Sequence, residues 1–182
     1  MRCVRLTRAL MALALVSPVA LTASQATAQQ TDYADAGQAG QARSDMLETF
    51  AITDLAAGQF RWADNIPSSG QTKIVISLTD QMGYVYRAGR LVGVTTVSSG
   101  STDHETPTGV FPILGKEKVH HSNTYDNASM PFMQRLNNYG VALHGGNNPG
   151  YPASHGCVRL PMKFAARLFE LTSTGSPVII EA

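Results

Sequence analysis

The chain has 182 residues, of which 43% are hydrophobic and 15% are charged, and its formal net charge is +1. Eleven of the 14 basic residues and all 13 acidic residues follow residue 28, so residues 29–182 carry a net charge of −2. The Lys and Arg residues are scattered and form no basic cluster of the kind that binds polyanions, which argues against nucleic acid as a partner.

The first 28 residues have the pattern of a secretory signal peptide. Three arginines precede an apolar run over residues 9–21, and the Ala-Thr-Ala of residues 26–28 fits a cleavage site between small residues. The alternative, an uncleaved membrane anchor, is disfavoured because the run is shorter than the roughly 20 residues of a membrane helix. We therefore expect cleavage before Gln29, export to the periplasm and no membrane span in the released chain.

Residues 29–70 are expected to form a flexible leader that ends in a packing segment. The first twenty of them are rich in Ala, Gln, Gly and Asp and have few large apolar groups, which is typical of a mobile segment. Residues 60–67 include Phe60 and Trp62, and we expect them to pack on the domain that follows, residues 71–182.

From residue 72 the pattern changes to short β-like runs divided by turn residues. The first three runs follow one another closely and predict a β-meander. Residues 115–129 show no clear period and are predicted to form a long loop, which in a compact domain is often functional. The predicted strands are residues 73–78, 84–87, 91–98, 110–114, 132–136, 141–144 and 178–180.

One helix is predicted between the strands at residues 141–144 and 178–180. Pro161 fits its first turn, Phe164 and Leu168 recur at helical spacing, and Gly175 lies just past its end. Many short strands and a single helix indicate a mainly β protein, a β-sandwich-like domain or barrel whose one helix follows the cysteine-containing segment, residues 154–160.

Cys157 is the only cysteine after residue 28, and it lies in the run Ser154-His155-Gly156-Cys157. A free thiol is easily oxidised in an exported protein, so its retention suggests chemistry; a buried inert thiol or an intermolecular disulfide is the alternative. Few thiols are ionised at neutral pH, so a nucleophilic cysteine needs a base or a cation nearby. His155, two residues away, and His144, at the end of a predicted strand, are both candidates for that base.

Two neighbours of Cys157 allow more than one interpretation. Gly156 permits a sharp turn whose consecutive N–H groups form an oxyanion hole, or it is an ordinary turn glycine. Arg159 is suited to a bidentate contact with a substrate carboxylate, and equally to a structural ion pair.

The motif formed by His144-Gly145, a short spacer and Ser154-His155-Gly156-Cys157-Val158-Arg159 resembles the signature of the L,D-transpeptidase catalytic domain. This is the YkuD-type fold that remodels bacterial peptidoglycan. The resemblance covers residues 72–182 and extends to further motifs in the order such domains present them, at residues 97–100, 106–109, 122–125 and 130–132. The general family pattern often has Asn where this chain has Arg159, whereas many members near the Gram-negative type carry Arg.

The resemblance implies a β-sandwich-like domain in which Cys157 is the nucleophile and His144 is the base, oriented by the carbonyl of Gly145. His155 would shape the site, and the N–H groups of Gly156 and Cys157 would form the oxyanion hole. The substrate-binding residues that it implies are Ser154, Arg159, Gly145, Tyr125, Met130 and Phe132.

The reaction implied by this resemblance is acyl transfer on peptidoglycan stem peptides. The thiolate attacks the L-centre carbonyl of a diamino acid in a tetrapeptide, releases D-alanine and leaves a thioester. An amine of a neighbouring stem would give a 3→3 cross-link, and a lysine of an envelope lipoprotein would give an anchor. Water would make the protein an L,D-carboxypeptidase, and an amidase of the same fold is a further alternative. The implied chemistry needs no metal or organic cofactor.

Two other classes of function are compatible with these residues. A zinc site would draw on His120, His121, His144, His155 and Cys157, but one cysteine and no adjacent acidic residue do not match known zinc hydrolase motifs. A noncatalytic wall-binding module would keep the pocket and lack turnover.

Overall fold

The computed structural model describes residues 37–182. The predicted signal peptide, residues 1–28, and the first part of the predicted leader, residues 29–36, lie outside this range. Ten strands and two helices make up the described residues, so the fold is mainly β, as predicted. Within residues 37–182, no helix is long and apolar enough to cross a bilayer.

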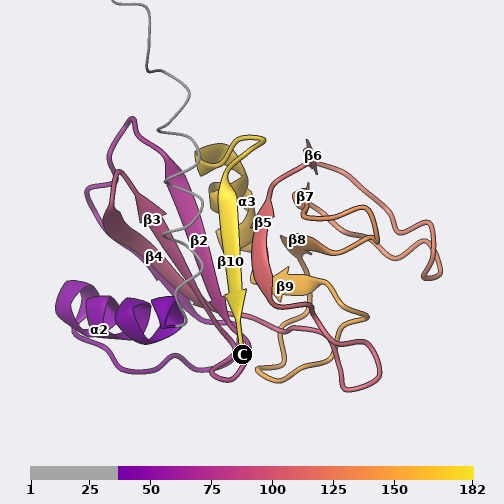
Figure 1. The fold of residues 1–182 in the computed structure, drawn as a ribbon, viewed down its shortest axis with the longest axis horizontal. Helices are drawn as coiled ribbons and strands as arrows, with labels where there is room; N and C mark the ends of the chain where they lie inside the picture. Colours follow the sequence, from indigo (N-terminus) through magenta and orange to yellow (C-terminus); the bar gives the residue numbers. More distant parts are fainter. Residues whose placement is uncertain (1–36) are drawn as a thin grey trace, which may run out of the picture.

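The elements are labelled as in Figure 1. In chain order they are α2 (Gln38–Phe50), β1 (Phe60–Trp62), β2 (Thr72–Ser77), β3 (Met82–Arg87), β4 (Arg90–Thr96), β5 (Gly109–Pro112), β6 (Gly115–Glu117), β7 (Met133–Arg135), β8 (Ala142–Gly145), β9 (Val158–Leu160), α3 (Met162–Leu171) and β10 (Pro177–Glu181).

The strands form a large sheet in the order β1-β4-β3-β2-β10-β5 and a small sheet in the order β6-β7-β8-β9. The predicted meander is confirmed, because β2, β3 and β4 pair antiparallel in sequence order. The C-terminal strand β10 then pairs parallel with β2 and antiparallel with β5. Figure 1 shows the small sheet on the right of the large one and α2 on its left.

Both faces of the large sheet are covered, which explains the uninterrupted apolar runs of its central strands. Ile74 and Ile76 of β2 belong to the core shared with the small sheet and α3. Val75 between them belongs to a second core, beneath α2. Alternate residues of a strand point to opposite faces, so a central strand between two layers must be apolar throughout.

Helix α2 corrects the expectation that residues 29–70 begin with a flexible leader, because residues 38–50 are ordered on the large sheet. Ala39, Ala42 and Met46 form its buried side. Two of these three residues are alanines, so the buried side carries little apolar weight, which is why composition alone suggested a mobile segment.

The beginning of α2 is held by the other end of the chain. The backbone N–H groups of Gln38 and Ala39 donate to the two carboxylate oxygens of Glu181 at 3.1 and 2.8 Å. The Tyr86 hydroxyl donates to Asp45 at 2.6 Å farther along the helix. A carboxylate at a helix N-terminus satisfies free N–H groups and opposes the helix dipole favourably, so β10 and α2 stabilise each other.

The prediction that residues 60–67 pack on the domain is confirmed. Strand β1 pairs with β4, and the Trp62 ring stacks on Phe164 of α3 with centroids 4.4 Å apart. Gly93 makes this approach feasible, because a β-carbon there would lie 2.4 Å from the Trp62 ring. Strands β1, β6 and β9 were not predicted as strands, since runs of three residues show too little alternation to be recognised.

Replacing Met46 by Ala tests the docking of α2. We expect the free energy of unfolding to fall by about 2–4 kcal/mol, because a fully buried methionine is lost and a cavity remains. Leu47→Ala is the matched control, since Leu47 is 53% exposed and its loss should change the same quantity by less than about 0.5 kcal/mol. Urea denaturation measures both, and equal effects would contradict the docked helix.

Candidate active site

One face of the small sheet carries the polar residues that the sequence singled out. Strands β8 and β9 run parallel, with Leu143 opposite Val158 and His144 opposite Arg159. Leu143 and Val158 are fully buried in the core, so alternation turns His144 and Arg159 to the opposite face. Cys157 directly precedes β9 and continues this register beside Ala142, on the same face as His144.

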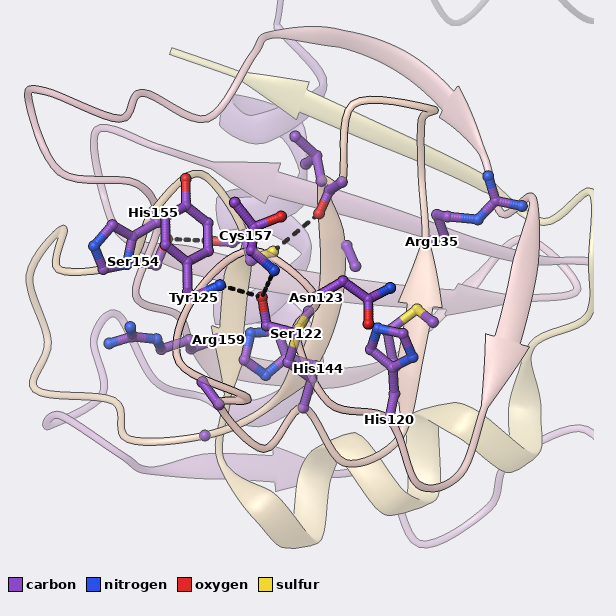
Figure 2. Close-up of a pocket in the computed structure, with 18 of the residues that line it drawn as sticks. His120, Ser122, Asn123, Tyr125, Arg135, His144, Ser154, His155, Cys157 and Arg159 are labelled. Atoms are coloured by element: carbon purple, nitrogen blue, oxygen red, sulfur yellow. Dashed lines mark hydrogen bonds between the residues drawn. The ribbon is translucent and has the colours of Figure 1, made fainter.

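A cavity of about 620 Å³ lies over this face. This volume is typical of ligand sites. Figure 2 shows Cys157 and His144 facing the same hollow, with His120 and Arg135 on the other side of it in this view. The loop between β6 and β7, predicted as a long loop, covers part of the cavity. The predicted site residues that line it are Tyr125, Met130, His144, Ser154, His155, Cys157 and Arg159.

The Cys157 thiol is partly buried and donates a weak hydrogen bond to the Gly140 carbonyl, with 3.4 Å between sulfur and oxygen. Burial raises the pKa of the thiol above its ordinary value. A backbone hydrogen bond with Ala142 and the charge of Arg159 act in the opposite direction and are outweighed. Burial therefore favours the neutral thiol form of the sulfur at the cavity wall.

The His144 imidazole is held in one orientation. Its Nδ1 lies 2.9 Å from the Gly145 carbonyl oxygen, so Nδ1–H donates and Nε2 keeps its lone pair. Only 6% of the residue is exposed, and burial lowers the pKa of the imidazole; the Gly145 hydrogen bond raises it, while Arg159 and His120 lower it further. The shifts of His144 and Cys157 together favour a neutral imidazole beside a neutral thiol.

The turn before Cys157 is fixed by a serine hydroxyl. Ser154 Oγ accepts from the Gly156 N–H at 3.1 Å and donates to the Cys157 carbonyl at 2.5 Å. Gly156 has φ +105°, which explains the need for glycine. Its carbonyl accepts from the Thr106 hydroxyl at 2.9 Å, and Thr106 in turn accepts from Gly100 N–H.

These contacts change the expectation for the oxyanion hole. The Gly156 N–H is already engaged by Ser154 and is not directed at a substrate. In residues 37–182 the Cys157 N–H has no hydrogen-bond partner, so it remains available as a donor at the sulfur. Gly156 acts on the geometry of the turn, and Ser154 supports the turn.

His155 is placed in an aromatic cluster at the cavity rim. Its ring stacks on Tyr125 at 4.3 Å between centroids and lies 4.8 Å from the His104 ring. Tyr125 belongs to the loop between β6 and β7, so the stack joins that loop to the turn before Cys157. This arrangement fits a residue that shapes the site.

The Arg159 side chain faces the cavity while its backbone is held by Ser98, through hydrogen bonds of 3.0 and 2.9 Å in both directions. Among the described residues its guanidinium has no hydrogen bond or ion pair. The structural ion pair that the sequence left open is therefore not formed here, and the guanidinium is available to an anionic ligand.

Two residues predicted to bind substrate do not line the cavity. Phe132 lies just before β7 and packs against the core, where its ring lies 6.0 Å from that of Phe169. Gly145 lies opposite Leu160 on the core side, and a β-carbon there would be 2.9 Å from Met162 Sδ. Its carbonyl orients His144, which is a supporting contact.

Several lining residues were not predicted, among them Glu117, Arg135 and Tyr139. His120 was considered only as a zinc ligand, and Asn123 only as part of the motif at residues 122–125. Alternation along β6 and β7 would identify Glu117 and Arg135, but the sequence indicated a loop where β6 lies. For the zinc alternative, residues 37–182 contain no group of three or more His, Cys, Asp or Glu side chains arranged to hold a metal ion.

A family model described as the L,D-transpeptidase catalytic domain, YkuD, matches residues 71–180. Among curated proteins, none matches the chain in sequence.

Solved structures share the fold. An L,D-transpeptidase from Mycobacterium smegmatis is 23% identical with a TM-score of 0.58, over 62% of this chain and 59% of that chain. L,D-transpeptidase 1 from Mycobacterium tuberculosis is 25% identical with a TM-score of 0.53, over 60% and 61%. An L,D-transpeptidase in complex with imipenem is 25% identical with a TM-score of 0.55, over 60% and 58%. The chain thus spans less than two thirds of the length of each.

The pH dependence of thiol alkylation tests the protonation state of Cys157. Because burial raises the pKa of the thiol, the rate of alkylation should reach half its maximum at a pH above the free-thiol value of about 8.5. Iodoacetamide labelling followed by intact-mass analysis measures this rate, with glutathione as the reference thiol. An inflection below about pH 7 would instead indicate a preformed thiolate–imidazolium pair.

Proposed function

The chain belongs to the YkuD family of L,D-transpeptidase catalytic domains, and we propose that it transfers acyl groups between peptidoglycan stem peptides through a thioester on Cys157. The observation that carries this proposal is the placement of Cys157 and His144 on one face of the small sheet, at the wall of a ligand-sized cavity.

In the first half-reaction His144 acts as a general base. Its Nε2 takes the proton of the Cys157 thiol while the sulfur attacks the L-centre carbonyl carbon of the diamino acid in a stem tetrapeptide. The negative charge on the carbonyl oxygen is received by the Cys157 N–H. The imidazolium then protonates the leaving amine, D-alanine departs, and a thioester remains.

In the second half-reaction an acceptor amine attacks the thioester carbonyl. The amine gives a proton to His144 Nε2, the carbon–sulfur bond breaks, and the imidazolium returns the proton to Cys157. We propose amines of neighbouring stems or of an envelope lipoprotein as acceptors. The neutral resting pair suits this cycle, because His144 must accept a proton at the start of each half-reaction.

Arg159 is proposed to receive a substrate carboxylate. Its guanidinium lies on the same face as Cys157, and the leaving D-alanine carries a carboxylate within a few bonds of the reacting carbonyl. Arginine binds carboxylates through two parallel hydrogen bonds, which would orient the tetrapeptide as well as hold it.

The proposed setting is the periplasm, where stem peptides occur and to which the predicted signal peptide would deliver the chain. Residues 71–182 would form the catalytic domain. Residues 38–50 and 60–62 are proposed to complete this domain, because α2 covers the outer face of the large sheet and β1 extends its edge.

Release of D-alanine from stem tetrapeptides tests the proposal. We expect Cys157→Ala to abolish release and His144→Gln to slow it by about 10²- to 10⁴-fold, because the general base is lost. His121→Gln is the control, since His121 is exposed and does not line the cavity, and its release rate should equal that of the unchanged chain. D-alanine release by Cys157→Ala at the normal rate would refute the role of the thiol.

A further inference from the structure

Gln81 is a buried polar residue at the end of the large sheet that the proposed mechanism does not use. It lies in the turn between β2 and β3, only 7% of it is exposed, and it does not line the cavity. Its backbone has φ +50°, in the left-handed region that residues other than glycine seldom adopt. Such a conformation persists where surrounding contacts hold it, so the contacts of Gln81 indicate what the turn supports.

The side-chain amide of Gln81 is engaged at both ends. Its Oε1 accepts from the Ser99 N–H at 2.9 Å, and its Nε2 donates to the Ser99 hydroxyl and to the Leu78 carbonyl, both at 2.7 Å. A backbone N–H only donates and a carbonyl only accepts, so these partners fix which end of the amide is oxygen. The position therefore needs an acceptor and a donor on one side chain, a requirement that methionine or an ionised glutamate of similar length does not meet.

Ser99 connects this amide to residues 153–157, the nucleophile turn. On its other side the Ser99 carbonyl accepts from the N–H groups of Ala153 and Ser154, both at 2.9 Å. Ser154 is the residue whose hydroxyl fixes the turn and donates to the Cys157 carbonyl. A continuous chain of hydrogen bonds thus runs from the large sheet through Ser99 and Ser154 to the backbone of the nucleophile.

The residues on either side of Ser99 bind the same part of the chain. The Ser98 N–H and carbonyl exchange hydrogen bonds with Arg159 at 3.0 and 2.9 Å, and the Ser101 N–H donates to the Ser154 carbonyl at 2.9 Å. Residues 98–101 therefore hold the nucleophile turn near both of its ends, and the buried amide attaches the middle of this segment to the turn between β2 and β3.

The position of the Cys157 sulfur relative to the imidazole depends on these contacts. His144 is part of β8, whose pairing with β9 begins with Leu143 opposite Val158. Cys157 lies one residue before this pairing begins, so the nucleophile turn and its hydrogen bonds determine where the sulfur lies. A displacement of about 1 Å between reacting groups can lower a rate by roughly 10²-fold.

We propose that Gln81 is a positioning residue for the acyl transfer, whose buried amide places the Cys157 sulfur through Ser99 and the nucleophile turn. This inference rests on the proposed function and adds to it a contribution from the large sheet. Gln81 does not line the cavity, so it acts on the reaction only through the residues that it holds.

The kinetics of D-alanine release from a stem tetrapeptide test this role. Gln81→Met keeps the length of the side chain and removes its hydrogen bonds. We expect kcat and kcat/KM to fall together by about 10- to 100-fold with KM unchanged, because a reacting group is misplaced. Gln71→Met is the matched control, since Gln71 is exposed and lies outside the cavity, and its constants should equal those of the unchanged chain.

Gln81→Glu tests the same contacts by rescue. Its carboxylate still accepts from the Ser99 N–H but cannot donate to the Leu78 carbonyl, whereas its protonated form can do both. The kcat of this variant, divided by that of the unchanged chain at the same pH, should rise as the pH is lowered. The ratio for Gln81→Met should stay constant. Each variant is measured where circular dichroism shows it folded, and Gln81→Glu decides the question if Gln81→Met does not fold.

Amide hydrogen exchange tests the connection without turnover. Followed by mass spectrometry, exchange in Gln81→Met and Gln81→Glu at neutral pH should become about tenfold faster in residues 98–101 and 153–157 and stay unchanged in α3. If the unchanged chain releases no D-alanine, the proposed function fails, and this exchange pattern still decides whether the buried amide holds the nucleophile turn.

Three results would overturn the proposal. The first is a Gln81→Met variant with the kinetic constants of the unchanged chain. The second is a rise in KM at constant kcat, which would assign the effect to substrate binding. The third is faster exchange throughout the chain, α3 included, which would show a general loss of stability.

Discussion

The parallel pairing of β8 and β9 is the constraint on which the site depends. It brings together two segments with a loop between them, and it places His144 and Cys157 on the same face because Leu143 and Val158 occupy the other. A shift of one residue in this register would exchange the two faces and bury His144 and Cys157 in the core. The apolar core and α3 therefore hold the thiol and the imidazole in position. They also stabilise the domain.

Burial at this face has a chemical consequence. Desolvation disfavours the charged form of each group, so it raises the pKa of Cys157 and lowers that of His144. In the proposed mechanism this favours a neutral resting pair that becomes charged only as the sulfur attacks. A neutral thiol is also the less easily oxidised form.

The sequence predicted most of the fold because its central strands are long and apolar on both faces, and because α3 has a clear helical period. It also singled out Cys157 and His144, and both line the cavity over the small sheet. It missed α2, whose docking depends on Glu181 at the other end of the chain, and it placed Phe132 in the site and Gly156 in the oxyanion hole. Glu117 and Arg135 were missed because their shared face exists only in the register of β6 with β7.

Acylation of Cys157 by a carbapenem tests the central claim most directly, because the reagent needs only the thiol, the base and the cavity. After incubation of the full chain with imipenem, intact-protein mass spectrometry should show one adduct per chain, and peptide mapping should place it on Cys157. An unmodified mass after prolonged exposure, or an adduct on another residue, would contradict an acyl-accepting thiol at this cavity wall.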